Sequence, residues 1–111
     1  SYRVMIRQPD FVTPDVLEAA IMNVSKKKSL SRFKDVRLES IEDGDCVQIL
    51  HVGPYDDEPE SFMKVDEFCA AHNLQRANDE WHREIYLSDA RKVEPAKLKT
   101  VLRVQVKSMQ F

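Results

Sequence analysis

The sequence predicts an α+β fold, with a mostly antiparallel sheet and two helices on one of its faces. Two segments combine helix-start signals with apolar residues at helical spacing, and several shorter apolar runs are bounded by turn residues, as strands are. The expected order is strand, helix, strand, strand, helix, strand, strand. Helices on one face leave the other face of the sheet open to solvent or to a ligand.

The first expected elements are a strand at Tyr2–Arg7 and a helix that follows it. Thr13 suits the N-cap of this helix and Pro14 its first position. An apolar face then follows at helical spacing, formed by Leu17, Ala20, Ile21 and Val24. Lys26–Lys28 suit the negative C-terminal end of the helix.

A β-hairpin is expected around Asp43-Gly44, a pair that readily adopts the positive dihedral angles of a type I′ turn. The strand-like runs on its two sides are "VRLESIE" and "CVQILHV". The second run, Cys46–Val52, is the most apolar stretch of the chain and is expected to be a central strand. Gly53 and Pro54 end it.

The second expected helix opens at Pro59 and ends near Asn73, a residue that tolerates the left-handed conformation of a C-cap. Leu74, just beyond it, is expected to fold back onto the helix. The apolar face consists of Phe62, Val65, Phe68 and Cys69. A loop "LQRANDE" follows, and the remaining expected elements are a strand at Trp81–Leu87, a helical turn at Glu94–Leu98 and a strand at Thr100–Val106.

Length and composition indicate one globular domain over residues 1–111, in a chain with net charge -2 and a pI of about 5.9. This balance gives no support for nucleic-acid binding, and no apolar run reaches the ~20 residues of a membrane span. Cys46 and Cys69 have no metal-like spacing and indicate reduced thiols in a cytoplasmic protein. The chain starts directly in a strand, which suggests a fragment.

The segment "WHREIYLSD" carries the main candidate for a functional residue, Glu84. Side chains alternate along a strand, so His82, Glu84 and Tyr86 share one face while Ile85 and Leu87 share the other. If the face of Ile85 packs on the helices, Glu84 points to the open face between two rings. Such a carboxylate suits an apolar cation, and burial would make it a candidate general acid or base.

Each candidate also has a structural interpretation. Glu84 on a solvent-facing sheet is an ordinary surface charge, paired across strands with Arg or Lys. His51 ends the apolar strand, where a hydrogen-bonded structural histidine is typical. Tyr55 can overhang a pocket or pack at its turn, and Met5 can line a ligand or belong to the core. The acidic run from Asp56 to Glu60 suits the positive start of a helix.

No phosphate-binding glycine loop and no nucleophile–histidine arrangement stands out in the sequence. His51, His72 and His82 lack the spacing of a metal site. We therefore expect no cofactor and no metal.

Two stretches, "LHVGPYDDEPESF" and "HREIYLSDARKVEPAKLKTVLRVQV", resemble the GyrI-like small-molecule-binding family, and "VMIRQPDFVTPD" is similar to the segment that joins the two halves of such domains. The family is named for a gyrase-inhibitory protein and includes effector domains of multidrug-responsive regulators. The resemblance implies a pair of β-α-β-β repeats, of which this chain holds the second and only part of the first. A homodimer is one way to supply the missing part of the ligand cleft.

The same resemblance implies that Glu84 is the central pocket glutamate, with Tyr86 and Tyr55 as pocket aromatics and Trp81 or His82 nearby. The leading expectation is a module that binds hydrophobic or aromatic small molecules, cationic ones among them, for sensing or sequestration. The alternative is a hydrolase of cyclopropane-bearing toxins, with Glu84 as base and a tyrosine as polarising donor. A third class is protein interaction through the acidic stretch "YDDEPE".

Overall fold

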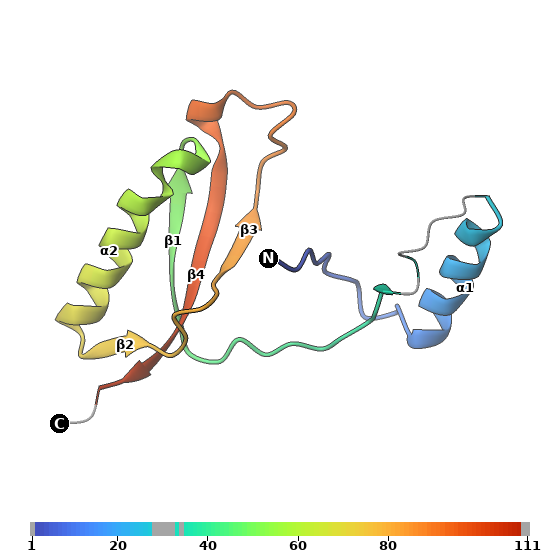
Figure 1. Cartoon of the computed structure of the whole chain (residues 1–111), viewed down its shortest axis with the longest axis horizontal. Coiled ribbons are helices and arrows are strands. Elements are labelled where there is room, and N and C mark those ends of the chain that lie inside the picture. Colours follow the sequence, from blue (N-terminus) through green and yellow to red (C-terminus); the bar gives the residue numbers. More distant parts are fainter. Residues whose placement is uncertain (1, 28–32, 34, 110–111) are drawn as a thin grey trace. The chain divides into compact units, whose positions relative to one another are not determined.

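The computed structural model describes residues 2–27, 33 and 35–109, which form two compact units, Ser1–Ile41 and Glu42–Phe111 (Figure 1). The described residues contain two α-helices and an antiparallel sheet of four strands, which confirms the predicted α+β class. Neither α-helix is long and apolar enough to cross a membrane.

The first unit is built around helix α1, Pro14–Ser25, which begins where the sequence predicts. The backbone N–H of Val16 donates to Thr13 Oγ1 at 3.3 Å, so Thr13 is the N-cap. Leu17 and Ile21 of the predicted apolar face are half-buried, and no residue of the helix is fully buried. Lys28 lies outside the described residues.

The predicted strand Tyr2–Arg7 is not formed, and neither is the first strand of the predicted hairpin, residues 36–42. Both segments are irregular and exposed. Glu39 makes ion pairs with Arg3 at 3.5 Å and with Arg37 at 3.1 Å, but no backbone ladder joins the two segments. A strand needs such a ladder to satisfy its N–H and C=O groups, so the apolar pattern alone did not produce one.

The sheet of the second unit is centred on β4, Lys99–Ser108. Strand β1, Cys46–Val52, pairs with it on one side, and the other side holds β3, Arg83–Tyr86, and β2, Leu74–Arg76. The prediction of β1 as a central strand is therefore wrong for the described residues, although its bounds are confirmed. β4 takes the centre because it is long enough to pair with three shorter strands.

Helix α2, Glu58–Ala71, covers one face of this sheet. The core between them contains Val65, Cys69, Val104 and Val106, with Val47, Ile49, Phe62 and Leu74 packed against it. Asn73 has the predicted left-handed conformation, φ 57°, and Leu74 returns the chain to the core. The segment predicted as the loop "LQRANDE" begins with the short strand β2, because Leu74 brings it beside the end of β4.

Two short 3-10 helices complete the unit: η2, Tyr55–Asp57, and η3, Pro95–Lys97, which matches the predicted helical turn. The predicted strand at Trp81–Leu87 is confirmed in a shorter form, β3. The thiols of Cys46 and Cys69 are free, and burial raises the pKa of both.

Asp43 holds the chain to the face of the sheet opposite α2. Its carboxylate accepts hydrogen bonds from Arg83 and, at 2.9 Å, from Arg103 Nη1. These two arginines pair directly across β3 and β4. The Arg83 guanidinium holds the pKa of Asp43 below its ordinary value, against the effect of burial. Gly44 has the expected positive φ, 68°, but the turn leads out of an irregular segment rather than a strand.

Candidate functional site

Strand β3 turns Glu84 toward the face of the sheet that α2 covers. Glu84 pairs with Leu102 of β4, and Leu102 pairs in turn with Ile49 of β1. Directly paired residues point to the same face. Leu102 is 0% exposed and alternates along β4 with Val104, a core residue beneath α2. The expectation that Glu84 lies on the open face is therefore wrong.

The error came from assigning Ile85 and Leu87 to the core. Ile85 pairs with Val101 on the face opposite α2, and Leu87 is 57% exposed. β4 and β1 already supply the apolar row beneath α2. β3 lies at the margin of the sheet, where its residues on the helix side meet the first turns of α2 instead of the centre of the core.

A second carboxyl, that of Glu58 at the first residue of α2, meets Glu84 there. Burial, a hydrogen bond with Glu84 and the charge of Glu84 together raise the pKa of Glu58 to about 7. Two carboxyl groups can share a hydrogen bond only when one of them carries a proton. Below about pH 7, Glu58 therefore holds a proton and donates it to Glu84 in a hydrogen bond.

The other oxygen of Glu58, Oε2, is buried and has no hydrogen-bond partner among the described residues. A buried acceptor without a donor is costly, by roughly 1 to 3 kcal/mol. An N–H group of a bound molecule is one kind of donor that would satisfy it.

Rings lie on both sides of Glu84 along β3. On one side His82 Nε2 is 3.4 Å from Glu84 Oε2, and the His82 ring meets Phe62 of α2 edge to face at a centroid distance of 4.7 Å. On the other side Tyr86 meets Tyr55 edge to face at 5.8 Å. We call the six residues the Glu58–Glu84 cluster; they are Tyr55, Glu58, Phe62, His82, Glu84 and Tyr86.

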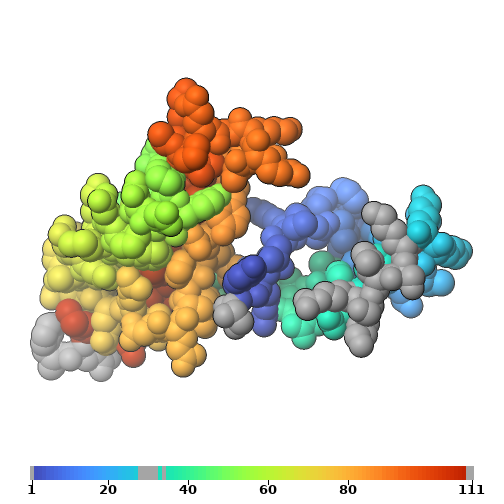
Figure 2. Space-filling view, turned by 45° about the horizontal axis from the view of Figure 1, so that its top comes forward, coloured from blue at the N-terminus to red at the C-terminus, as the bar shows by residue number. Residues whose placement is uncertain are grey.

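The cluster is sheltered but reachable from solvent. The side chain of Glu84 is 26% exposed, whereas Tyr86 is 62% exposed. In Figure 2 the residues of α2 (green to yellow) and the segment around β3 (orange) meet on the surface of the second unit. The two tyrosines are therefore more exposed to solvent than the Glu84 carboxyl.

His51 has a structural position at the end of β1. It is 4% exposed, its Nδ1 lies 2.7 Å from Ser61 Oγ and its Nε2 lies 2.8 Å from the Pro54 carbonyl. Because a carbonyl can only accept, Nε2 carries the proton and Nδ1 accepts from the serine hydroxyl. His51 thus joins β1, the Gly53-Pro54 turn and α2, with both ring nitrogens engaged.

Two of the predicted site residues, Trp81 and Met5, are not members of the cluster. Trp81 precedes β3 and is half-exposed. Met5 belongs to the first unit, Ser1–Ile41. Among the residues that the structure describes, no three His, Cys, Asp or Glu side chains gather in a way that could hold a metal ion.

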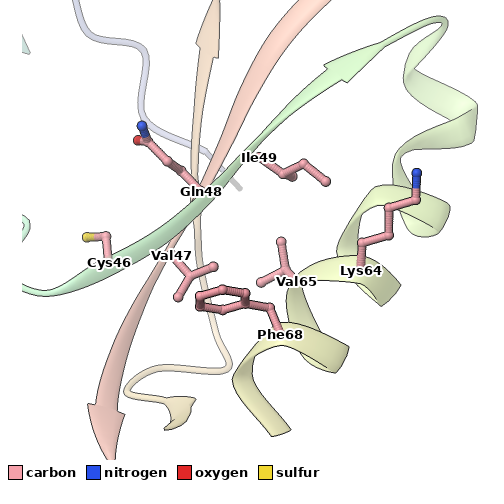
Figure 3. Close-up of a pocket in the computed structure, with 7 residues that line it drawn as sticks. All are labelled: Cys46, Val47, Gln48, Ile49, Lys64, Val65 and Phe68. Carbon is pink, nitrogen blue, oxygen red and sulfur yellow. The ribbon is translucent and has the colours of Figure 1, made fainter. Parts of the chain in front are cut away.

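A separate apolar groove of about 330 Å³ lies between β1 and α2. Val47, Ile49, Val65 and Phe68 point toward this space, whereas Gln48 extends to the other side of β1 (Figure 3). The rest of the lining is Cys46 and Lys64. None of the residues predicted for the ligand site lines this groove.

Sequence reasoning missed Glu58 and Phe62 as members of the site. Glu58 was explained by the helix dipole, and Phe62 by the apolar face of α2. The only local signal is that Glu58 sits one residue before Pro59, at the first position of the helix. Its contact with Glu84 depends on how α2 crosses the sheet, which the sequence pattern does not encode.

Residues 2–107 match the model of the GyrI-like small molecule binding domain. No curated protein matches the chain. Among solved structures, an uncharacterized conserved protein from Listeria innocua is 43% identical, with a TM-score of 0.85 over 91% of this chain and 50% of its own.

Two further similar structures are described as hydrolases from Listeria innocua. Both are 41% identical and cover 91% of this chain, with TM-scores of 0.82 and 0.80, and this chain spans 52% and 50% of their lengths. The chain is therefore about half as long as the solved structures it matches. The match over nearly all its residues and the shared fold show that the chain belongs to the GyrI-like small-molecule-binding domain family.

Proposed function

We propose that this domain binds hydrophobic, cationic small molecules at the Glu58–Glu84 cluster, for multidrug-type sensing or sequestration. The observation that carries the proposal is the position of Glu84, a partly desolvated carboxylate with rings on both sides of it. The rings of Tyr55, Tyr86 and Phe62 offer apolar area and cation–π attraction, and the carboxylate offers charge. Partial desolvation strengthens that attraction relative to water.

Binding of rhodamine 6G, a hydrophobic dye with a fixed positive charge, tests this proposal by fluorescence anisotropy at pH 8. Glu84→Gln removes the charge but keeps the shape, and we expect it to weaken binding by at least about tenfold, or ~1.4 kcal/mol. Glu80→Gln, in the exposed segment before β3, is the matched control and should bind as the wild type does. Equal affinity of the wild type and Glu84→Gln would contradict the proposal.

The second candidate function is a hydrolase that opens cyclopropane-bearing toxins. It is favoured by the protonated Glu58 beside Glu84 and by the description of two similar structures as hydrolases. Glu84 would take a proton from water, whose oxygen attacks a ring carbon of the cyclopropane. The ring C–C bond breaks, its electrons move to the conjugated carbonyl, and Tyr55 or Tyr86 supplies the proton that makes it a hydroxyl.

Turnover distinguishes the two candidates. A spirocyclopropane dienone incubated with the protein and analysed by mass spectrometry should gain one water if the protein is a hydrolase. Glu84→Gln should then abolish product. If the wild type binds the compound saturably and returns it unchanged, the binding function stands alone.

We propose further that the protein forms a homodimer by pairing β1 with β1 of a second copy. β1 has β4 on one side and no strand on the other within the described sheet. Gly53 N donates to the Leu98 carbonyl and Val106 N to the Asp45 carbonyl, so the odd-numbered positions bond to β4. The even-numbered positions, Gln48 and Leu50 among them, direct their N–H and C=O groups to the free edge.

An antiparallel pair centred on Ile49 satisfies those groups and places the two apolar grooves side by side. Leu50→Pro removes an N–H that β4 does not use, so the monomer should fold while pairing is blocked. We expect a dimer for the wild type and a monomer for Leu50→Pro in sedimentation velocity experiments. A wild-type monomer that still binds rhodamine 6G would contradict the dimer and leave the ligand site intact.

The free thiols of Cys46 and Cys69 suit a reducing compartment, and we propose that the protein acts in the cytoplasm. We also propose that residues 1–111 act as one domain, because the family model extends over both compact units.

A further inference from the structure

We propose that ligand capture at the Glu58–Glu84 cluster is a proton-for-cation exchange, in which a cation takes the place between the two carboxyls that a shared proton holds in the free protein. This inference rests on the proposed ligand site and adds Glu58 to it as a second binding residue. It makes affinity for cations depend on pH, with tighter binding as pH rises.

The two carboxyls lie close enough together to share a proton. Glu58 opens α2 and Glu84 lies on the helix-covered face of β3, so the two carboxyls meet where the start of α2 crosses the sheet. Two adjacent carboxylates repel, and one of them is partly desolvated, so the pair retains a proton up to about pH 7. The carboxyls themselves therefore define the position that a cation would compete for.

The exchange keeps the net charge of the site constant. Before binding, two carboxyls and one proton carry a net charge of minus one in total; afterwards, two carboxylates and one monovalent cation carry the same charge. The proton leaves from Glu58 to solvent, and no bond other than that O–H bond breaks. Keeping the charge unchanged avoids the cost of adding charge to a partly buried place.

The buried Oε2 of Glu58 favours ligands that carry a hydrogen-bond donor. This oxygen has no hydrogen-bond partner among the described residues. It belongs to one of the two paired carboxyls, which lie among the rings of the cluster. A cation with an N–H donor would satisfy this acceptor, whereas a quaternary ammonium group would not. The preferred ligands are therefore aromatic cations that carry N–H groups beside their charge.

Other titratable groups on the surrounding elements enter the pH dependence. His82 matters most, because its Nε2 lies 3.4 Å from Glu84 Oε2 and an imidazole can gain or lose a proton. A positively charged His82 would also repel a cation. Its effect on affinity is therefore distinguished from that of Glu58 by a separate variant, His82→Gln. The other groups are His51, Tyr55, Asp56, Asp57, Arg76 and Tyr86.

The experiment measures the affinity for rhodamine 6G, which carries N–H groups and a charge that does not titrate, from pH 5.5 to pH 8.5. For one proton released with a midpoint near pH 7, wild-type affinity should rise about tenfold between pH 6 and pH 8. Glu58→Gln, with an amide that mimics the protonated acid, should bind at every pH about as the wild type does at pH 6. His82→Gln should retain most of the rise.

Calorimetry of dye binding in two buffers with different heats of ionisation counts the protons released and needs no variant. We expect release approaching one proton per dye at pH 6 and close to none at pH 8.5. A wild-type affinity independent of pH, or a rise that persists in Glu58→Gln, overturns the exchange while the ligand site stands. Failure of the wild type to bind the dye at any pH refutes the ligand site itself.

Discussion

Replacing Glu58 by Gln should stabilise the protein at pH 8 and change its stability little at pH 5. The pKa of Glu58 is about 7 in the folded protein, against an ordinary value of 4.5. The folded state therefore binds this proton more tightly than the unfolded state does. Its contribution to the free energy of unfolding is fully present below about pH 4.5 and is lost as pH rises through 7.

The size of this loss follows from the change in proton affinity. The rise from 4.5 to about 7 sets an upper limit of roughly 3 kcal/mol, at about 1.4 kcal/mol for each tenfold change in affinity. Glu58 is partly exposed, so solvent screening reduces the expected effect to about 1 to 2 kcal/mol. The amide of Glu58→Gln has no proton to lose, and it can still donate a hydrogen bond to Glu84.

Urea denaturation followed by circular dichroism at pH 5, 6, 7 and 8 measures the effect. Glu60→Gln is the matched control, because Glu60 lies in the same first turn of α2 but is exposed. We expect the free energies of the wild type and Glu58→Gln to diverge as pH rises, and those of the wild type and Glu60→Gln to stay parallel. Parallel curves for the wild type and Glu58→Gln would show that the two carboxyls do not share a proton.

Two other changes test contacts that hold the site in place. Asp43→Asn leaves Arg83 and Arg103 side by side without their anion. It should lower the free energy of unfolding by about 2 kcal/mol, measured by urea denaturation at pH 7. The control, Asp45→Asn, should have a small effect. Because the pKa of Asp43 is lowered in the folded state, this difference should shrink as pH falls below about 4. Ser61→Ala removes the hydroxyl that donates to buried His51. It should lower the free energy of unfolding by about 1 to 2 kcal/mol, measured by thermal melting. Ser61→Thr keeps a hydroxyl and should lower it less.

Elements with local signals were predicted well from the sequence. The N-cap at Thr13, the strand Cys46–Val52, the start of α2 near Pro59 and the left-handed Asn73 all depend on a few neighbouring residues. Their physical causes, capping, fixed φ and glycine or proline breaks, act over one turn or less. The sequence therefore contains what decides them.

Strand formation was predicted less well, because a strand depends on a partner elsewhere in the chain. "VRLESIE" has the composition of a strand yet pairs with nothing in the described residues, whereas Leu74–Arg76, predicted as loop, pairs with the end of β4. The same dependence explains the wrong face for Glu84. Alternation shows which side chains share a face, but not which face meets the helix.

At Glu58 a local influence and a tertiary influence act on the protonation state in opposite directions. At the start of a helix, the dipole favours a charged carboxylate, and this local explanation is sufficient at the level of sequence. Burial and the neighbouring Glu84 act in the opposite direction and raise the pKa to about 7. The protonation state near neutral pH is thus a result of tertiary structure.

Strand β3 has only four residues, Arg83–Tyr86, and makes polar side-chain contacts on both of its faces. Consecutive side chains point to opposite faces: Arg83 binds Asp43 on the face away from α2, and Glu84 meets Glu58 beneath α2. So short a strand gains little from its own ladder, and an ion pair on one face and a hydrogen bond between carboxyls on the other help to fix its position. The Arg83–Asp43 pair thereby helps to position Glu84 in the proposed ligand site.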